Sequence, residues 1–397
     1  MSSARRRAVL AIAVGAIALD SALLGLIAPL LPDLEERVGA SESELGLALG
    51  AYALPVIVVS LPLGRLCDRR GRRSLLISGL LLTVIGSLAI AFAESLLPLI
   101  MGRGVQGIGA AASWIAALAL VSDLAPPGRK GESIGYALAA NGVGAIGGPA
   151  LGGLTGEAIG FEFPFLLVAG IGVALAAAAI AVLPRDLVPK AAAAARGGLR
   201  DLFALALAPA VRPATIAIIV GATTIGVLEV VAPLDASERL GLGAGAIGAL
   251  FAASIALDAI AAPIAGRASD RKGRRFVTLL GLVGVLLSAV LLAVLGGVGG
   301  LIVGLCVFGI GSSALFAAAV PWLDDAFAGT AKGFGYGFLN LIFAIGYAIG
   351  PIAAGVGFDH AGAASVYWIE AAALVATIAL VFTARQLPAS GPDGDPA

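Results

Sequence analysis

The chain has 397 residues, of which 59% are hydrophobic and only 13% are charged, and its 25 basic and 25 acidic side chains give a formal net charge of zero. This apolar surface exceeds what one soluble core can bury. The composition therefore excludes an ordinary soluble globular protein and predicts a membrane protein.

Twelve mostly apolar stretches, separated by short polar breaks, run along the chain. Each is close to the length of about 20 residues that a membrane-spanning helix needs. The 56 glycines suit such helices, because small residues let helices approach one another closely in lipid. We predict an all-α membrane protein with spans at 8–31, 45–63, 74–95, 97–122, 134–156, 161–183, 214–234, 243–265, 276–296, 299–323, 333–357 and 363–384.

Lysine and arginine gather in alternate breaks between the spans. One set of breaks holds nearly all of the 25 basic residues, whereas the opposite set holds only Arg37 and Arg239. The positive-inside rule places the first set in the cytoplasm. We therefore predict a multi-pass protein of the inner membrane with both termini cytoplasmic. Its basic clusters lie beside the spans, where they suit lipid head groups rather than nucleic acid.

The first predicted span contains Asp20 near its middle. A lone carboxyl group inside the membrane is either protonated, turned to a wet cavity or bound to a cation, and each state suits a proton-coupled transporter. The alternative is a permanently neutral acid that bonds to the backbone.

A ten-residue segment occurs twice in the chain. GRLCDRRGRR at 64–73 returns 202 residues later as GRASDRKGRR at 266–275, and the same spacing relates Gly148-Pro149 to Gly350-Pro351. A spacing that is kept from residue 64 to residue 149 indicates an internal duplication.

The duplication predicts two six-helix halves, at 1–183 and 214–386, with a substrate site between them near the membrane midplane. A cytoplasmic linker at 184–213 would join the halves, and residues 387–397 would form a disordered tail. The alanine run at 191–195 leaves two interpretations of the linker open, a helix on the membrane surface or a solvated tether.

The segment at 64–73 resembles the cytoplasmic loop signature of the major facilitator superfamily, and the segment at 266–275 resembles its second copy. The resemblance covers nearly the whole chain and implies twelve transmembrane helices in two pseudo-symmetric halves. It implies that Asp68 faces the second half and that Arg72 pairs with Asp123. The residues of this conformational latch would be Gly64, Asp68, Arg72, Asp123, Gly266, Asp270 and Arg274. The alternative is that these cations only set the topology.

The fourth predicted span also resembles a motif of the superfamily, carried by Leu99, Arg103, Gln106, Gly107, Gly109 and Ala110. The resemblance links Arg103 to proton coupling. An arginine inside the membrane is costly unless it is paired or hydrated. A side chain that merely reaches from the helix end to the membrane surface is the alternative.

The fifth predicted span is similar to the antiporter motif of drug and proton exchangers, and the similarity rests on Gly144, Gly148, Pro149, Gly152 and Gly153. Proline removes a backbone hydrogen bond, and glycines leave a smooth groove against which another helix can slide. A purely structural kink is the alternative, because residues 346–355 have a similar pattern.

The seventh predicted span contains a second candidate acid, Glu229. Residues 19–32 and 226–233 resemble the vesicular amine transporters and their bacterial drug-exporting relatives, which implies that Asp20 and Glu229 couple protons to substrate. Asp258 and Glu370 also fall within predicted spans, where they either couple protons or bond between helices.

The chain departs from those relatives at Gly311 and Asn340, where the vesicular amine transporters have acids. This departure argues against transport of monoamines by the same mechanism. Polar or aromatic side chains that stand out in the apolar spans are candidates to line the cavity, with helix packing as the alternative. These residues are Asn141, Asn340, Tyr347, Trp114 and Phe251.

Together these features predict a proton-coupled secondary transporter that exports small organic compounds, such as drugs, by alternating access. Sugar or metabolite efflux, or uptake by symport or uniport, is the alternative. The partners would be a lipophilic or cationic small molecule, protons and membrane lipids, and the protein would be a monomer.

Catalysis has no support in the sequence. It contains no nucleotide loop, no metal-ligand spacing and no Ser/His/Asp set, so we expect neither an enzyme nor a metal or other cofactor, with the proton gradient as the energy source. Cys67 in a predicted loop and Cys306 in a span are not expected to pair. His360, in a short outer loop, receives no role.

Overall fold

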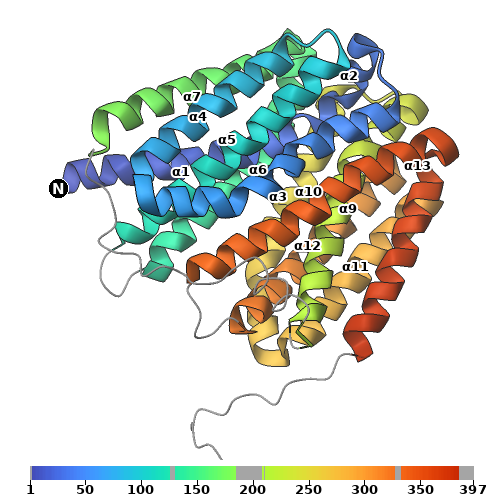
Figure 1. The fold of residues 1–397 in the computed structure, drawn as a ribbon. Helices are drawn as coiled ribbons and strands as arrows, with labels where there is room; N and C mark the ends of the chain where they lie inside the picture. The colour runs from blue at the N-terminus through green and yellow to red at the C-terminus, as the bar shows by residue number, and fades with distance from the viewer. Residues whose placement is uncertain (1, 126–129, 185–207, 210, 327–331, 384–397) are drawn as a thin grey trace, which may run out of the picture.

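The computed structural model describes residues 2–125, 130–184, 208–209, 211–326 and 332–383 (Figure 1). Within the helices, the side chains of 61, 65, 68–70, 130–136, 138, 324–326 and 332–337 lie outside the description. Most of the predicted linker and the whole predicted tail therefore fall outside it, as does the side chain of Asp68.

Helices are the only regular secondary structure in the described part of the chain. Its helices are α1 (Ser3–Leu26), the short 3₁₀ helix η1 (Ala28–Leu30), α2 (Leu31–Val38), α3 (Glu42–Arg70), α4 (Arg72–Ala91), α5 (Leu96–Asp123), α6 (Lys130–Ile159), α7 (Glu162–Val182), α9 (Arg212–Leu240), α10 (Ala244–Lys272), α11 (Arg274–Val294), α12 (Gly297–Ala326) and α13 (Lys332–Thr383).

Ten stretches among the described residues are long and apolar enough to cross a membrane. The twelve predicted spans map onto these helices with two complications. α13 contains the last two spans, which meet at a kink where Gly362 has a non-helical backbone with φ 74°. α6 corresponds to the fifth span but is not one of the ten, and only part of its side chains is described. The chain is an all-α, multi-pass membrane protein.

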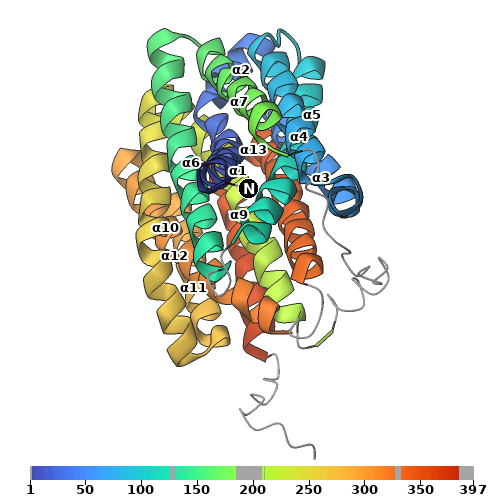
Figure 2. The ribbon, with the colours of Figure 1, turned by 90° about the vertical axis from the view of Figure 1, so that its left-hand side faces the viewer.

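The helices form two bundles, α1 to α7 and α9 to α13 (Figure 1). Within the first bundle α4 packs on α5 and α1 packs on α6, and within the second α9 packs on α13 and α11 packs on α12. Between the bundles, α3 packs along α13 and α6 packs along α10. Figure 2 shows α6 and α10 side by side on one flank of the molecule.

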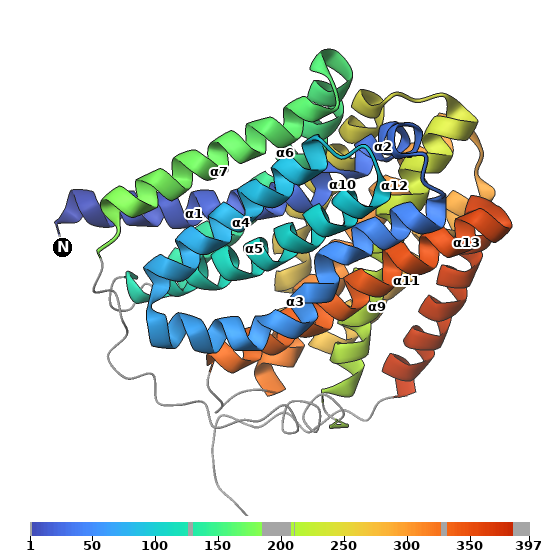
Figure 3. The same cartoon turned by 45° about the horizontal axis from the view of Figure 1, so that its top comes forward.

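The two ends of the molecule differ in charge and in how closely the bundles approach. We name the end that contains Arg72 and Arg274 the basic end, and the end that contains Glu42 and Glu157 the acidic end. Figures 1 and 3 show that the helices of the two bundles meet at the acidic end and diverge toward the basic end.

Two local predictions are wrong. The segments at 64–73 and 266–275 are not loops, because α3 continues to Arg70 and α10 to Lys272, and only Gly71 and Gly273 interrupt the helices. Both glycines have positive φ, 88° and 93°, which other residues adopt with strain. Cys67 is accordingly a buried helical residue, and His360 lies in α13 rather than in a loop.

The first span is interrupted rather than continuous. α1 ends at Leu26, η1 follows, and α2 resumes at Leu31. Pro29 and Pro32 explain the break, because proline cannot donate the backbone hydrogen bonds that a continuous helix needs and fits best in the first turn of a new helix. The break lies beyond Asp20, which remains in regular helix.

Candidate transport site

Asp20 is buried between α1 and α5. The residue is 5% exposed, and its Oδ2 accepts a hydrogen bond of 2.6 Å from the hydroxyl of Ser113. Its other oxygen, Oδ1, has no hydrogen-bond partner among the described residues. The alternative that Asp20 bonds to the backbone is therefore not what the structure shows.

Arg103 is 0% exposed, although it lies only about two turns from the start of α5. Its Nη1 donates to Gln106 Oε1 at 3.0 Å, and Gln106 in turn donates to Ser87 Oγ at 2.9 Å. Its guanidinium carbon lies 4.6 Å from the ring centre of Tyr52, which is cation–π geometry. Nε and Nη2 have no hydrogen-bond partner among the described residues. The alternative of a side chain that reaches the membrane surface is wrong.

Glu229 is the candidate coupling acid of the second bundle. It is 6% exposed and accepts a hydrogen bond from the hydroxyl of Tyr347 on α13. Tyr347 stacks on Phe343, with ring centres 6.2 Å apart, and meets the ring of Tyr52 edge-on at 6.4 Å. Tyr52 belongs to the first bundle and Tyr347 to the second, so the aromatic contact joins the two.

Tyr52 is the residue around which these groups gather. It interacts electrostatically with Asp20, Arg103 and Glu229, which come from α1, α5 and α9. Glu229 also interacts electrostatically with Arg103. No ion pair joins any two of these three charged residues within the part of the chain that the structure describes. The arrangement places two carboxyl groups and one cation, all buried, at the junction of the bundles.

Asp258 and Glu370 each bond to a hydroxyl of a neighbouring helix. Ser312 on α12 donates to Asp258 at 2.5 Å, and Thr224 on α9 donates to Glu370. The sequence left two interpretations of these acids open, proton coupling and bonding between helices. The contacts are those of the second interpretation. Neither acid belongs to the group around Tyr52.

The predicted cavity-lining residues divide into three groups. Tyr347 donates to Glu229 and meets the ring of Tyr52. Asn340 donates to Ser60 Oγ at 3.1 Å, which is a contact between α13 and α3, whereas Asn141 accepts from Ser21 within the first bundle. Trp114 and Phe251 pack with one cluster of the hydrophobic core, whereas Tyr52 packs against another.

The glycines of the fifth-span motif lie where helices touch most closely. A Cβ atom at Gly144, Gly148 or Gly152 would overlap a backbone carbonyl oxygen of α1, and one at Gly153 would overlap the carbonyl oxygen of Ala244 at the start of α10. The motif therefore faces both its own bundle and the other one, with Pro149 against Gly248 of α10.

The same contacts recur in the second bundle at the repeat spacing. Gly346 and Gly350 approach carbonyl oxygens of α9, Gly355 approaches that of Glu42, and Pro351 lies against Gly46 of α3. The similar patterns at 144–153 and 346–355 thus serve the same packing in both halves.

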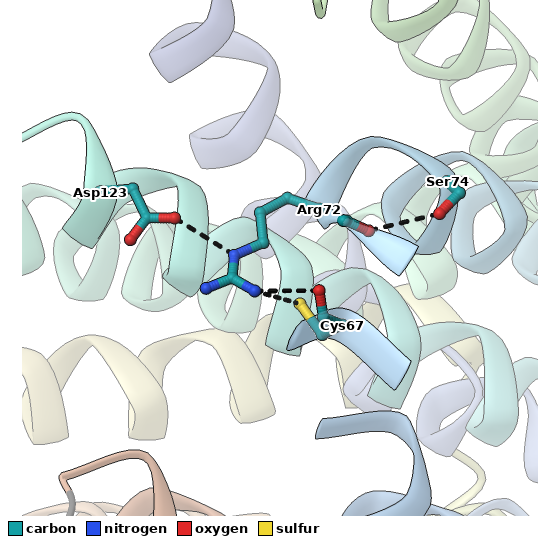
Figure 4. Close-up of polar contacts among 5 residues, drawn as sticks. Cys67, Arg72, Ser74 and Asp123 are labelled. Atoms are coloured by element: carbon teal, nitrogen blue, oxygen red, sulfur yellow. Dashed lines mark hydrogen bonds and ion pairs between the residues drawn. The ribbon is translucent and has the colours of Figure 1, made fainter. Parts of the chain in front are cut away.

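At the basic end, Arg72 Nε lies 3.1 Å from Asp123 Oδ2, the pair that the family resemblance led us to expect (Figure 4). Arg72 also donates to the carbonyl oxygen of Cys67 at 2.9 Å, so it joins α4, α5 and the end of α3. In the second bundle Arg274 pairs with Asp270 at 2.5 Å, within one turn of the chain. Gly64 and Gly266 have open space around them.

Sequence reasoning missed Tyr52 and Ser113. Ser113 directly precedes Trp114, a predicted cavity-lining residue. A serine in an alanine-rich helix gives little signal by itself. Tyr52 is the single aromatic residue of the span predicted at 45–63, so the rule that selected aromatic residues such as Tyr347 in apolar spans could also have selected Tyr52.

Comparison with known proteins agrees with this architecture. The chain matches the model of the Major Facilitator Superfamily over residues 10–227 and again over 214–397. It resembles a solved structure titled as a bacterial homolog to the human lysosomal transporter Spinster, in inward-facing and unoccupied conformation. The TM-score is 0.76 at 16% identity, and the likeness covers 97% of this chain and 96% of that one. At that identity it shows the fold alone.

Higher sequence identity is found with resistance proteins over part of the chain. The chain is 35% identical over 154 residues to the class B tetracycline resistance protein of Escherichia coli. It is 37% identical over 155 residues to the class H tetracycline resistance protein of Pasteurella multocida. It is 29% identical over 150 residues to the quinolone resistance protein NorA of Staphylococcus aureus. Each match spans 38% of this chain and 38% of the relative. The fold and the family match over both halves together show that this chain belongs to the Major Facilitator Superfamily.

Proposed function

We propose that the protein is a proton-coupled secondary transporter that exports small organic compounds by alternating access. One observation carries the proposal: Asp20, Arg103 and Glu229 are buried together around Tyr52, without an ion pair among them in the described residues. Charges at membrane depth are costly unless they are neutralised or paired. Carboxyl groups in this setting can exchange a proton for a substrate group.

The partial relatives support the direction and the class of substrate. Their names assign resistance to tetracycline and to quinolones, and resistance by a transporter requires export. Tetracycline, a quinolone and lipophilic cations are therefore the compounds that we would test first.

The proposed cycle uses the two bundles as rocking halves, residues 1–183 and 214–386. Asp20 and Glu229 alternate between a protonated state and a state that binds substrate. The charge of Arg103 interacts differently with the protonated and the ionised carboxyl groups. The fifth-span motif slides against α10, and the pair Arg72–Asp123 with the segments around Asp68 and Asp270 steadies one end state. The protein lies in the inner membrane with its basic end on the cytoplasmic side. The monomer is the transporting unit.

The test uses purified protein in liposomes that contain a pH-sensitive dye. Each compound is added outside, and proton movement is compared between the wild type, Asp20→Asn, Glu229→Gln and the matched control Glu370→Gln. Glu370 is a buried acid of another helix pair, bonded to Thr224, and glutamine can accept the same hydrogen bond. We expect compound-evoked proton movement in the wild type and the control, and its loss in the other two variants.

Two results would contradict the proposal. Substrate movement without proton flux would indicate a facilitator. Wild-type proton flux in Asp20→Asn and Glu229→Gln would show that other acids couple transport.

A further inference from the structure

Two carboxylates reach across the junction of the bundles at the acidic end, and each ends on the first turn of a helix of the other bundle. Asp359, on α13, accepts hydrogen bonds from the backbone N–H groups of Glu42 and Ser43, both at 3.1 Å, and from the Ser43 hydroxyl. These residues begin α3. Asp359 therefore joins the second bundle to the first.

The second contact runs in the opposite direction. Glu157, on α6, accepts a hydrogen bond of 2.6 Å from the backbone N–H of Gly245 in the first turn of α10. The carboxylate also lies where a side chain at Gly243 or Gly245 would be, so it occupies the space that these glycines leave. Glu157 therefore joins the first bundle to the second.

The internal duplication relates the two contacts. Asp359 lies 202 residues after Glu157, and Gly245 lies 202 residues after Ser43, which is the spacing of the repeated basic segments. The surrounding backbone contacts repeat as well, with Gly153 against Ala244 and Gly355 against Glu42. The contacts thus occupy equivalent positions in both halves.

Neither helix supplies these bonds from its own sequence. The first N–H groups of a helix lack intrahelical acceptors and need a capping group. At the start of α3 the side chain of Ser41 accepts only from the N–H of Glu44, and the N-cap residue of α10, Gly243, supplies no side-chain cap. The other bundle therefore provides the missing acceptors.

We propose that Glu157 and Asp359 are cross-bundle caps that hold the acidic end closed and thereby set the balance between the two end states of transport. A carboxylate on helix N–H groups is a charge-assisted hydrogen bond, and it is favoured further by the helix dipole. Opening the acidic end must separate α6 from α10 and α3 from α13. Both caps must break when the end opens. The loss of these hydrogen bonds therefore opposes opening in each half.

The ratio of open to closed acidic ends can be measured in the full-length protein in lipid nanodiscs, from the distribution of distances between two spin labels. Glu94→Cys and Gly296→Cys place one label on each bundle, in exposed connections at the acidic end that take no part in the caps, in a Cys67→Ser, Cys306→Ser background. The caps are weakened by Glu157→Gln, by Asp359→Asn and by both together. The matched control is Glu162→Gln, which neutralises an acid at the same end that pairs with Arg37 inside the first bundle.

A fourth variant separates the bond from the charge. Gly245→Ala adds a Cβ atom 2.5 Å from Glu157 Oε2, so the carboxylate must move away while its charge remains. Alanine also favours helix more than glycine does. A gain of open protein in this variant therefore cannot come from an unravelled α10.

We expect each neutralised cap to raise the ratio of open to closed acidic ends about tenfold, the double variant to raise it further, and Gly245→Ala to raise it in the same direction. Glu162→Gln should match the background. Unchanged distances in both single variants and in the double variant would overturn the proposal, as would an equal shift in Glu162→Gln. The measurement uses neither substrate nor a proton gradient, so its outcome is independent of the proposed antiport.

Discussion

Ser113 Oγ lies 2.6 Å from Oδ2 of Asp20 and ties the middle of α5 to α1. Because Oδ1 has no partner among the described residues, this bond positions the carboxyl group. The serine hydroxyl also lies 2.9 Å from the carbonyl oxygen of Gly109, which orients it on its own helix. A proton carrier at Asp20 would thus be aimed by a residue of a different helix.

The first prediction concerns this bond. Ser113→Ala leaves the buried carboxyl without a donor, and an unmade buried hydrogen bond costs about 1–3 kcal/mol. We expect compound-evoked proton flux in liposomes to fall about tenfold at unchanged protein yield, since about 1.4 kcal/mol corresponds to a factor of ten. Ser113→Cys keeps a weaker donor and should give an intermediate rate. Wild-type flux in Ser113→Ala would show that the bond does not position Asp20 for transport.

The second prediction concerns the guanidinium of Arg103 over the ring of Tyr52. Arg103→Lys keeps the charge but loses the planar group that stacks on the ring and bonds Gln106, so we expect severe loss of transport. Tyr52→Phe keeps the ring face and should retain most activity, whereas Tyr52→Ala should lose it. Export rates from loaded vesicles measure all three variants. Equal rates for Tyr52→Phe and Tyr52→Ala would contradict a role for the ring.

The third prediction compares glycines on two faces of α6. A side chain at Gly144 would overlap the carbonyl oxygen of Ala18, whereas Gly147 has no atom within 4 Å of an added Cβ. Overpacking typically costs about 1–3 kcal/mol, while alanine in an open helical position gains up to about 1 kcal/mol over glycine. Gly144→Ala should therefore lower the midpoint of thermal unfolding in detergent, and Gly147→Ala should leave it unchanged or raise it. Equal midpoints would argue against the close contact of α6 with α1.

The fourth prediction concerns the basic end. The Arg72 side chain is 9% exposed and bonds both Asp123 and the Cys67 carbonyl, whereas the Asp123 side chain is 46% exposed. A half-exposed ion pair contributes at most about 1 kcal/mol. Arg72→Ala should thus destabilise the protein more than Asp123→Ala does, because it removes the hydrogen bond to the Cys67 carbonyl as well as the ion pair. Equal losses of the free energy of unfolding would mean that the ion pair is the whole contribution of Arg72.

Helix positions were predictable because they depend on local properties. Length, apolar composition and polar breaks define a membrane helix within a single segment, and the resemblance at 64–73 led to the pair Arg72–Asp123. The extent of the helices was less predictable. α3 and α10 run through the basic segments to Gly71 and Gly273, since arginine and leucine there are good helix formers and only glycine adopts the positive φ of the turn.

The sequence by itself determined that the chain lies in a membrane, that it is duplicated and that Asp20 and Glu229 are buried acids. The tertiary structure alone decided their neighbours, because these depend on the rotation of each helix and on which bundles meet. Ser113 and Tyr347 stand 93 and 118 residues from the acids that they contact, and Asp359 stands 316 residues from Ser43. No local pattern encodes contacts at such separations. The first two form only when helices of one bundle have packed together, and the third forms only when the two bundles have met.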